Sequence, residues 1–305
     1  MRAVFVDANE SLAAITKKLR RDRDPPIAIH RDPDIAPDAL PAVLGDAEIA
    51  IIDHTYLPTP VAAQCRALRH VVFLGTGARS YMNPEELAAH GIAVHTIKGY
   101  GDTAVAECAI ALMWASARGL ARMDRGMRGG EWLRFDALQL TGKTLGLVGF
   151  GGIAAEVARI ALGSGMTVIA WNRSPRAYPG VDFVALERLL ALSDVVSLHL
   201  LLTDETRGFF SQERIAAMKP GVILVNTARA ALVDEAAMIA ALRSGHIRHA
   251  GLDVFAVEPL PAGHVLTTLE NVTLSAHSAF RTPEASDNLI AAALDHCRRI
   301  AGTGR

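Results

Sequence analysis

Short apolar runs alternate with helical patterns along most of this 305-residue chain, and that alternation limits what the chain can fold into. In the first hundred residues the expected strands are 3–6, 27–29, 49–52, 71–74 and 92–94. Helices are expected at 12–19, 62–68 and 84–89, and a proline-rich loop at 33–41. Apolar strands separated by helices predict a parallel sheet that is covered by helices on both faces.

A second series of the same kind follows a long alanine-rich segment. Residues 103–123 form one helical pattern that is apolar nearly all round, which is typical of a helix packed between two domains. After a polar linker, 125–131, further apolar runs are found at 143–149, 167–171, 195–200, 222–226, 250–254 and 272–275. Because ~150 residues make a domain, we expect an α/β protein with two doubly wound, Rossmann-like parallel sheets.

The charge and the cysteines exclude several classes of protein. With 31 Lys+Arg against 32 Asp+Glu the formal net charge is -1, so no nucleic-acid partner is expected. No apolar run reaches the roughly 18–20 residues of a membrane span, so no membrane association is expected either. Cys65, Cys108 and Cys297 are widely spaced and follow no metal-ligand pattern. We therefore expect no disulfide, no metal site, and a cytoplasmic location.

A glycine-rich turn follows the first strand of the second series. Gly149, Gly151 and Gly152 come directly after the apolar run 144–148, and Ile153 and Ala154 begin a helical pattern. Gly149 permits the tight turn, Gly151 lets the backbone approach a diphosphate, and the first N–H groups of the helix can bind its negative charge. A glycine turn placed between a strand and a helix predicts a dinucleotide-binding site.

The end of the next strand bears on which dinucleotide binds. An acidic residue there would bind the ribose 2′-hydroxyl of NAD(H), whereas an arginine accommodates the 2′-phosphate of NADP(H). This chain has Asn172, Arg173 and Ser174 at that position. The sequence therefore favours NADP(H); NAD(H) is possible if Arg173 is an ordinary surface arginine.

Two residues that could do chemistry follow later strands. Arg229 comes after the run 222–226, where a guanidinium can bind a carboxylate and polarise a neighbouring ketone. His277 comes after the run 272–275 and could protonate a carbonyl oxygen. Glu258, 19 residues earlier, could hold the imidazolium. Taken singly, an arginine at a strand end is more often part of a surface ion pair, and Glu258 is plausible as an ordinary loop carboxylate beside Pro259.

Taken in order, the motifs resemble the D-specific 2-hydroxyacid dehydrogenases, closest in character to the NADPH-dependent glyoxylate/hydroxypyruvate reductases. The resemblance rests on 105–107, 149–154, 202–208, 218–229, 233–235, 251–255, 258–261 and 275–277. It implies that Arg229, Glu258 and His277 are the catalytic residues. It further implies that Gly75, Thr76 and Gly77 bind the substrate with Arg229 and His277, that Thr227, Ala228 and Asp253 lie near the nicotinamide, and that Thr203 lies near the adenosine.

The resemblance also implies an organisation and an activity. Residues 1–99 and 279–305 would form a substrate-binding domain and residues 100–278 a dinucleotide-binding domain, with the active-site cleft between them. The expected reaction is reduction of a small 2-keto acid to the D-2-hydroxy acid, in a homodimer. Departures from the family pattern at Ala230, Leu201 and Phe280 leave the substrate open. The alternatives are an NAD-linked D-3-phosphoglycerate or D-lactate-type dehydrogenase and, in another class, a dinucleotide-sensing binding protein.

Overall fold

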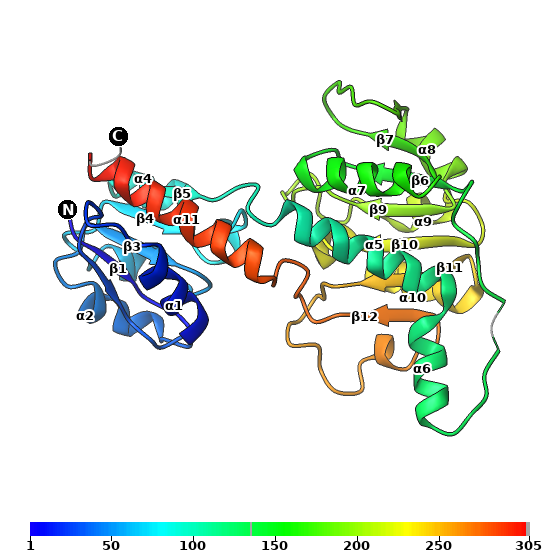
Figure 1. Cartoon of the computed structure of the whole chain (residues 1–305), viewed down its shortest axis with the longest axis horizontal. Helices are drawn as coiled ribbons and strands as arrows, with labels where there is room; N and C mark the ends of the chain where they lie inside the picture. Colours follow the sequence, from blue (N-terminus) through cyan, green and yellow to red (C-terminus); the bar gives the residue numbers. More distant parts are fainter. Residues whose placement is uncertain (135, 303–305) are drawn as a thin grey trace. The chain divides into compact units, whose positions relative to one another are not determined.

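The chain folds into two compact units, each with its own parallel sheet. A computed structural model describes residues 1–134 and 136–302. One unit comprises Met1–Gly101 and the chain from Thr282 onward, and the other comprises Asp102–Arg281. In Figure 1 the first unit is drawn in blue and cyan with a red C-terminal helix, and the second in green to orange. The predicted class, an α/β protein with two parallel sheets, is confirmed.

The first unit has a five-stranded sheet in the order β2-β1-β3-β4-β5, and all neighbouring strands are parallel. The strands are β1 (Ala3–Phe5), β2 (Ile27–Ile29), β3 (Ile49–Ile52), β4 (His70–Phe73) and β5 (Ala93–Thr96). The helices are α1 (Glu10–Leu19), α2 (Leu40–Leu44), α3 (Thr59–Ala62), α4 (Pro84–Ala89) and α11 (Pro283–Ile300). The strand order reverses between β1 and β3, which is the hallmark of a doubly wound sheet.

The C-terminal helix α11 completes the core of this first unit. It packs against α1 and β4 and buries Leu289, Ile290 and Leu294 in a cluster with Phe5 and Ile49. Thr282 caps the helix, because its hydroxyl accepts a hydrogen bond from the Ala285 N–H at 3.1 Å. Residues from the two ends of the chain therefore share one apolar cluster.

The second unit has a seven-stranded parallel sheet in the order β12-β11-β10-β9-β6-β7-β8. The strands are β6 (Thr144–Val148), β7 (Thr167–Trp171), β8 (Val181–Phe183), β9 (Val195–Leu198), β10 (Val222–Asn226), β11 (Ile247–Leu252) and β12 (Val272–Leu274). The order reverses between β6 and β9, so the carboxyl ends of these strands form the edge where an open α/β sheet binds ligands.

Helices cover both faces of the second sheet. On one face α5 (Asp102–Arg118) and α7 (Gly152–Gly163) pack together through small buried residues such as Ala106 and Ala158. On the other face lie α8 (Leu186–Leu192), α9 (Gln212–Ala216) and α10 (Glu235–Ser244). Alternate strand residues fill the two clusters, for example Leu147 on one face and Val148 on the other. This is the arrangement expected of strands that are buried on both faces.

The long helix expected over 103–123 is wrong as a single element. It ends at Arg118, Gly119 adopts a left-handed conformation (φ +63), and α6 (Leu120–Arg128) continues at 65° to it. Glycine is the residue that allows this break, because it enters the left-handed region without steric cost. Among the described residues no single helix is long and apolar enough to cross a membrane, although the bent pair α5–α6 would pass by length and composition alone.

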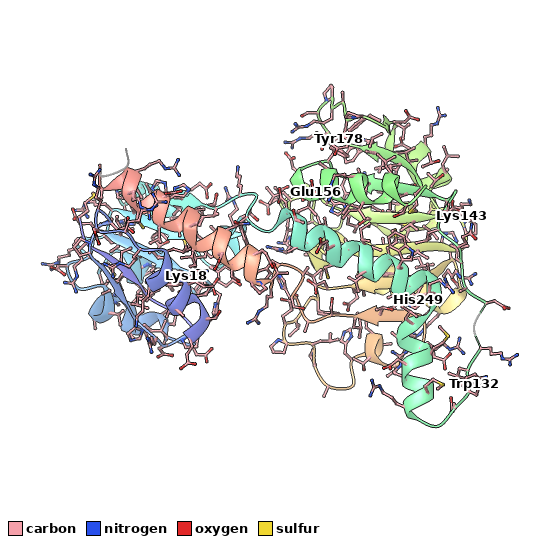
Figure 2. The ribbon with its side chains drawn as sticks, in the orientation of Figure 1. Lys18, Trp132, Lys143, Glu156, Tyr178 and His249 are labelled. Atoms are coloured by element: carbon pink, nitrogen blue, oxygen red, sulfur yellow. The ribbon has the colours of Figure 1, made fainter. Side chains whose placement is uncertain are left out.

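A buried histidine makes the second unit sensitive to acid. His249 in β11, labelled in Figure 2, is 2% exposed, and its Nε2 lies 2.9 Å from the Thr273 hydroxyl oxygen. Burial, with smaller contributions from Arg125 and Arg248, lowers the pKa of His249 to about 4. The unfolded chain binds a proton on this side chain near pH 6.5 and the folded chain does not, so stability is lost as pH falls from 6.5 towards 4.

We expect this one side chain to reduce the free energy of unfolding by about 2 kcal/mol between pH 7.5 and pH 5. The change to make is His249→Gln, which removes the titration and keeps a polar side chain. Urea unfolding at both pH values should show a smaller loss of stability in acid for the variant than for the wild type. An identical loss in the two proteins would contradict the assignment.

Candidate active site

The glycine loop joins β6 to α7 in a conformation that only glycine tolerates at its first position. Gly149 has a φ of +87°, and a Cβ there would lie 2.7 Å from the carbonyl oxygen of His199. The Gly149 N–H donates to the Trp171 carbonyl oxygen at 2.8 Å, which ties the loop to the end of β7. A left-handed backbone pressed against a neighbouring carbonyl excludes any side chain at this position.

The next glycine, Gly151, leaves the start of α7 open. A Cβ on Gly151 would meet no atom within 4 Å, so another group can approach the backbone there. Gly151 is the N-cap of α7, and glycine has no side chain to satisfy the first N–H groups of Gly152 and Ile153. Those N–H groups and the positive end of the helix dipole suit a phosphate. The loop therefore fits the predicted diphosphate site.

Asn172 supports the loop from the end of β7. Its Oδ1 accepts a hydrogen bond from the Phe150 N–H at 3.1 Å, and its Nδ2 donates to the Ser174 carbonyl oxygen at 2.8 Å. Arg173 is 83% exposed, and its Nη1 lies 3.1 Å from Glu205 Oε2. Glu205 belongs to the turn that begins at Thr203. The ion pair therefore links Arg173, after β7, to the turn that carries Thr203. No pattern in the sequence indicates this Arg173–Glu205 pair.

Substituting Gly149 tests whether the turn is required. In Gly149→Ala the added Cβ would meet the His199 carbonyl in a strained backbone, so we expect dinucleotide affinity to fall by roughly tenfold or more and stability to drop by more than ~1 kcal/mol. Gly221→Ala is the matched control, because Gly221 has a similar φ of +82° but nothing within 4 Å of its Cβ position. Fluorescence titration with NADPH and thermal melting measure both effects. Equal effects of the two substitutions would contradict the role assigned to the close contact.

His277 and Glu258 form a close pair beyond the ends of β12 and β11. The His277 Nδ1 lies 2.6 Å from Glu258 Oε2, and Glu258 Oε1 accepts a hydrogen bond from the Phe255 N–H at 2.8 Å. Both side chains remain about one-third exposed. Because Nδ1 is held by the carboxylate, Nε2 is the imidazole nitrogen left to exchange a proton with a bound molecule. The ring of Phe280 stands edge-on to the imidazole, with centroids 6.4 Å apart.

The buried carboxylate of Asp253 holds the loop that carries His277. Asp253 is 0% exposed and accepts hydrogen bonds from the Ser275 hydroxyl (2.6 Å) and from the N–H groups of Ser278 (3.1 Å) and Ala279 (3.0 Å). Its backbone carbonyl accepts from the His277 N–H at 2.7 Å. These bonds hold His277 in a left-handed conformation with a φ of +45°, which is rare outside glycine. Contact of Asp253 with the nicotinamide stays a prediction.

Arg229 and its neighbours follow β10. Asn226, 2% exposed, accepts from the Ala228 N–H (3.0 Å) and donates to the Arg229 carbonyl oxygen (3.0 Å), so it shapes the turn that carries Arg229. Arg229 is half-buried, and its Nη1 donates to the Ala228 carbonyl oxygen at 2.6 Å. The Thr227 hydroxyl is buried and has no hydrogen-bond partner among the described residues. A buried hydroxyl of this kind suits a bound ligand, as predicted for Thr227.

The structure brings most of the predicted residues to one edge of the second sheet. Arg229 follows β10, Asp253 follows β11 and His277 follows β12, and these three strands are neighbours. The turns are joined directly: the Asp253 N–H donates to the Asn226 carbonyl, and the Ser275 N–H donates to the Leu252 carbonyl. The glycine loop follows β6 at the same edge. Sequence reasoning missed the supporting role of Asn226, for which a polar residue ending an otherwise apolar strand was the only signal.

The predicted substrate loop lies in the first unit and follows β4. Gly75 is buried, and its carbonyl oxygen accepts a hydrogen bond from the Ile97 N–H at 3.0 Å. Thr76 is exposed, and Gly77 is the N-cap of a short 3-10 helix, Ala78–Ser80. The loop is therefore a defined turn with one exposed residue.

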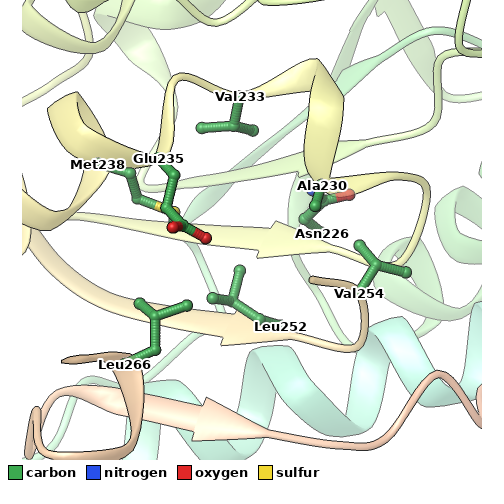
Figure 3. Close-up of a pocket in the computed structure, with 8 residues that line it drawn as sticks. All are labelled: Asn226, Ala230, Val233, Glu235, Met238, Leu252, Val254 and Leu266. Atoms are coloured by element: carbon green, nitrogen blue, oxygen red, sulfur yellow. The ribbon is translucent and has the colours of Figure 1, made fainter. Parts of the chain in front are cut away.

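Two cavities are found in the second unit. The larger, of about 200 Å³, lies at the amino ends of β11 and β12, opposite the sheet edge that carries the candidate site, and is bordered by Arg122, His249 and Glu270. The smaller, of about 10 Å³, lies between β10, β11 and α10, bordered by Ala230 and Met238 among others (Figure 3). Room for about one water molecule is too little for a substrate. Within residues 1–134 and 136–302 no group of three or more His, Cys, Asp or Glu side chains is placed to hold a metal ion.

A glycine cradle and a histidine–carboxylate pair at the ligand-binding edge of one parallel sheet are the marks of a nicotinamide-dependent oxidoreductase. Comparison with known proteins identifies the family within this class of oxidoreductases. Residues 110–279 match the NAD binding domain of the D-isomer specific 2-hydroxyacid dehydrogenases, and the chain belongs to this family.

Individual relatives agree with the family assignment. A hydroxypyruvate reductase of Thermotoga maritima is 36% identical over 255 residues, which cover 81% of this chain and 83% of that protein. A glyoxylate reductase of Aeropyrum pernix is 41% identical over 222 residues, 66% of each chain. Among solved structures, the TT0316 protein from Thermus thermophilus superposes with a TM-score of 0.87 at 32% identity, covering 99% of this chain and 97% of that one.

Proposed function

We propose that the protein reduces a small 2-keto acid of the glyoxylate/hydroxypyruvate type to the D-2-hydroxy acid, with NADPH as the preferred reductant. The observation that carries the proposal is the His277–Glu258 pair, held at 2.6 Å at the same sheet edge as Arg229 and the glycine loop. The names of the two relatives, a hydroxypyruvate reductase and a glyoxylate reductase, support the choice of substrate.

Each residue of the proposed catalytic set has a distinct task. The Arg229 guanidinium binds the substrate carboxylate through charge-assisted hydrogen bonds and polarises the adjacent carbonyl. The reduced nicotinamide, when bound, supplies a hydride to the carbonyl carbon. The carbonyl oxygen gains the electron pair of its π bond and takes a proton from His277 Nε2. Glu258 keeps the imidazole in place and stabilises its positive charge before the transfer. Backbone N–H groups of the loop Gly75, Thr76 and Gly77 are proposed to bind the substrate carboxylate as well.

The reaction is tested by following NADPH or NADH oxidation with glyoxylate, hydroxypyruvate, pyruvate and 3-phosphohydroxypyruvate. We expect glyoxylate or hydroxypyruvate with NADPH to be turned over fastest. His277→Ala should lower kcat by about 10²–10⁴-fold while NADPH affinity is retained, because the proton donor is lost and the dinucleotide site is not.

The matched control is His264→Ala. His264 also faces a carboxylate, with its Nε2 3.5 Å from Glu235 Oε1, but the proposed mechanism gives it no role. Its removal should leave kcat unchanged. A wild-type protein that binds NADPH and turns over none of the four acids would favour a dinucleotide-sensing role. Preference for pyruvate or 3-phosphohydroxypyruvate with NADH would favour the D-lactate or D-3-phosphoglycerate alternative.

The proposed preference for NADP(H) rests on the end of β7. No carboxylate follows this strand, and the highly exposed Arg173 guanidinium is available to a 2′-phosphate that displaces Glu205. In the double variant Asn172→Asp, Arg173→Ala the aspartate retains an oxygen for the Phe150 N–H and gains the charge that repels a 2′-phosphate.

For this double variant we expect the ratio of kcat/KM for NADPH over NADH to fall by roughly tenfold or more. Arg176→Ala is the control, because Arg176 is an exposed arginine three residues further along the same segment. Steady-state kinetics with both cofactors measure the ratio. An unchanged ratio in the double variant would remove Arg173 from cofactor selection.

Membership of the family supports a proposal for the role of each unit and for a homodimer. The second unit would be the dinucleotide-binding domain and the first unit the substrate-binding domain. Exposed apolar side chains gather on and after α6, where Leu120, Met127 and Trp132 are 52%, 53% and 75% exposed, and Figure 2 labels Trp132. Apolar surface of this kind supports the proposal of a homodimer.

A further inference from the structure

A carboxylate lies against the start of the phosphate-binding helix. Asp102 is the first residue of α5, and a Cβ built on Gly152 would lie 1.8 Å from its Oδ2 and 2.7 Å from its Cγ. The contact is possible because alanines such as Ala106 and Ala158 let α5 and α7 approach closely. Gly152 is therefore needed because the Asp102 carboxylate already occupies the space of a side chain.

The Asp102 carboxylate is partly desolvated and has no side-chain partner among the described residues. The side chain is half-buried, and it forms no hydrogen bond or ion pair with any residue that the structure describes. Burial raises the pKa of Asp102 above its usual value, and the charge of Glu156 raises it further. An unpaired, partly buried carboxylate lowers the stability of the fold. Groups of this kind are therefore found mainly where they serve a function.

The remaining charged groups nearby do not neutralise Asp102. On α7, Glu156, labelled in Figure 2, is paired with Arg159 at 3.0 Å. On α5, Glu107 is exposed and carries the same sign of charge. At the ends of the strands beneath α5, the Asp253 carboxylate binds the loop of His277, and His277 binds Glu258. The neighbouring carboxylates thus disfavour a charge on Asp102, whereas the positive ends of the α5 and α7 dipoles favour it.

The diphosphate of a dinucleotide would bring two further negative charges to this helix end. Two anionic groups within a few ångströms in a partly buried site repel each other strongly. This repulsion is removed when one of the two groups takes up a proton. We propose that Asp102 takes up one proton from the solvent when a dinucleotide binds to the glycine loop, so that cofactor affinity depends on pH. The inference rests on the proposed dinucleotide site, and it makes the charge of Asp102 a determinant of cofactor affinity at that site.

The linkage has a definite sign. Where the proton is taken up, affinity falls as pH rises, by at most tenfold per pH unit for one proton. Asp102→Asn has no charge to neutralise and nearly the same shape. We expect it to bind with an affinity that is independent of pH, roughly tenfold tighter than the wild type at pH 8 and equal to it in acid.

The experiment is isothermal titration of the full chain with ADP-ribose between pH 5.5 and 8.5. ADP-ribose carries the diphosphate, its phosphates do not titrate in this range, and it lacks the nicotinamide, so no turnover interferes. Repeating the titration at pH 7 in two buffers with different ionisation enthalpies measures the number of protons taken up. The wild type should take up a measurable fraction of a proton at this pH and Asp102→Asn should take up none. Asp102→Ser is a second neutral variant, and Glu187→Gln, an exposed carboxylate on α8, is the control that should match the wild type.

The outcomes separate the inference from the proposed function. If the wild type and Asp102→Asn bind ADP-ribose with the same affinity and the same proton uptake, the role of Asp102 is overturned and the dinucleotide site stands. Weaker binding by both Asp102→Asn and Asp102→Ser would also overturn it, because the carboxylate would then be a favourable contact. If neither the wild type nor any variant binds ADP-ribose, NADPH or NADH, both the inference and the proposed function fail.

Discussion

The buried carboxylate of Asp253 is the interaction on which the arrangement of the site depends. It accepts three hydrogen bonds from residues on both sides of His277, and its own backbone receives the His277 N–H. A histidine in a left-handed conformation persists only where its surroundings determine it. With the backbone held, the imidazole reaches Glu258, which is itself held by the Phe255 N–H. The reactive pair is thus supported by a group that solvent does not reach.

The parallel sheet brings the other turns of the candidate site together. Turns separated by more than a hundred residues in the chain meet because β6, β10, β11 and β12 all end at the same edge. Hydrogen bonds between successive turns then fix their spacing, as between Asp253 and Asn226. The chemistry proposed here needs a cation, an acid and a diphosphate cradle, and each occupies its own strand end. A fold of this kind can alter one turn while the others stay in place.

Much of the fold was predictable from local pattern, because apolar runs bounded by turns were frequent and regular. Every expected strand exists, and the glycine loop and the three residues of the proposed catalytic set occupy the expected turns. Some errors arise where one residue changes the backbone: Gly119 ends α5, and Pro37 and Pro41, at first-turn positions, start short helices. The helix expected at 62–68 is also wrong, because α3 spans Thr59–Ala62, and the edge strand β8 was not expected. The positions of Asp102 beside Gly152 and of Glu205 beside Arg173 depend on tertiary packing, which no local pattern contains.

The placement of α11 has a consequence for the order of folding during synthesis. The second unit is one continuous stretch of chain, so all of its strands are synthesised before α11. The first unit is encoded first, but Leu289, Ile290 and Leu294 of α11 are part of its core. The apolar face that these residues cover therefore stays exposed on the first unit until α11 has been made. N-terminal domains usually fold first during synthesis, but here the N-terminal unit can complete its core only after the whole second unit has been synthesised.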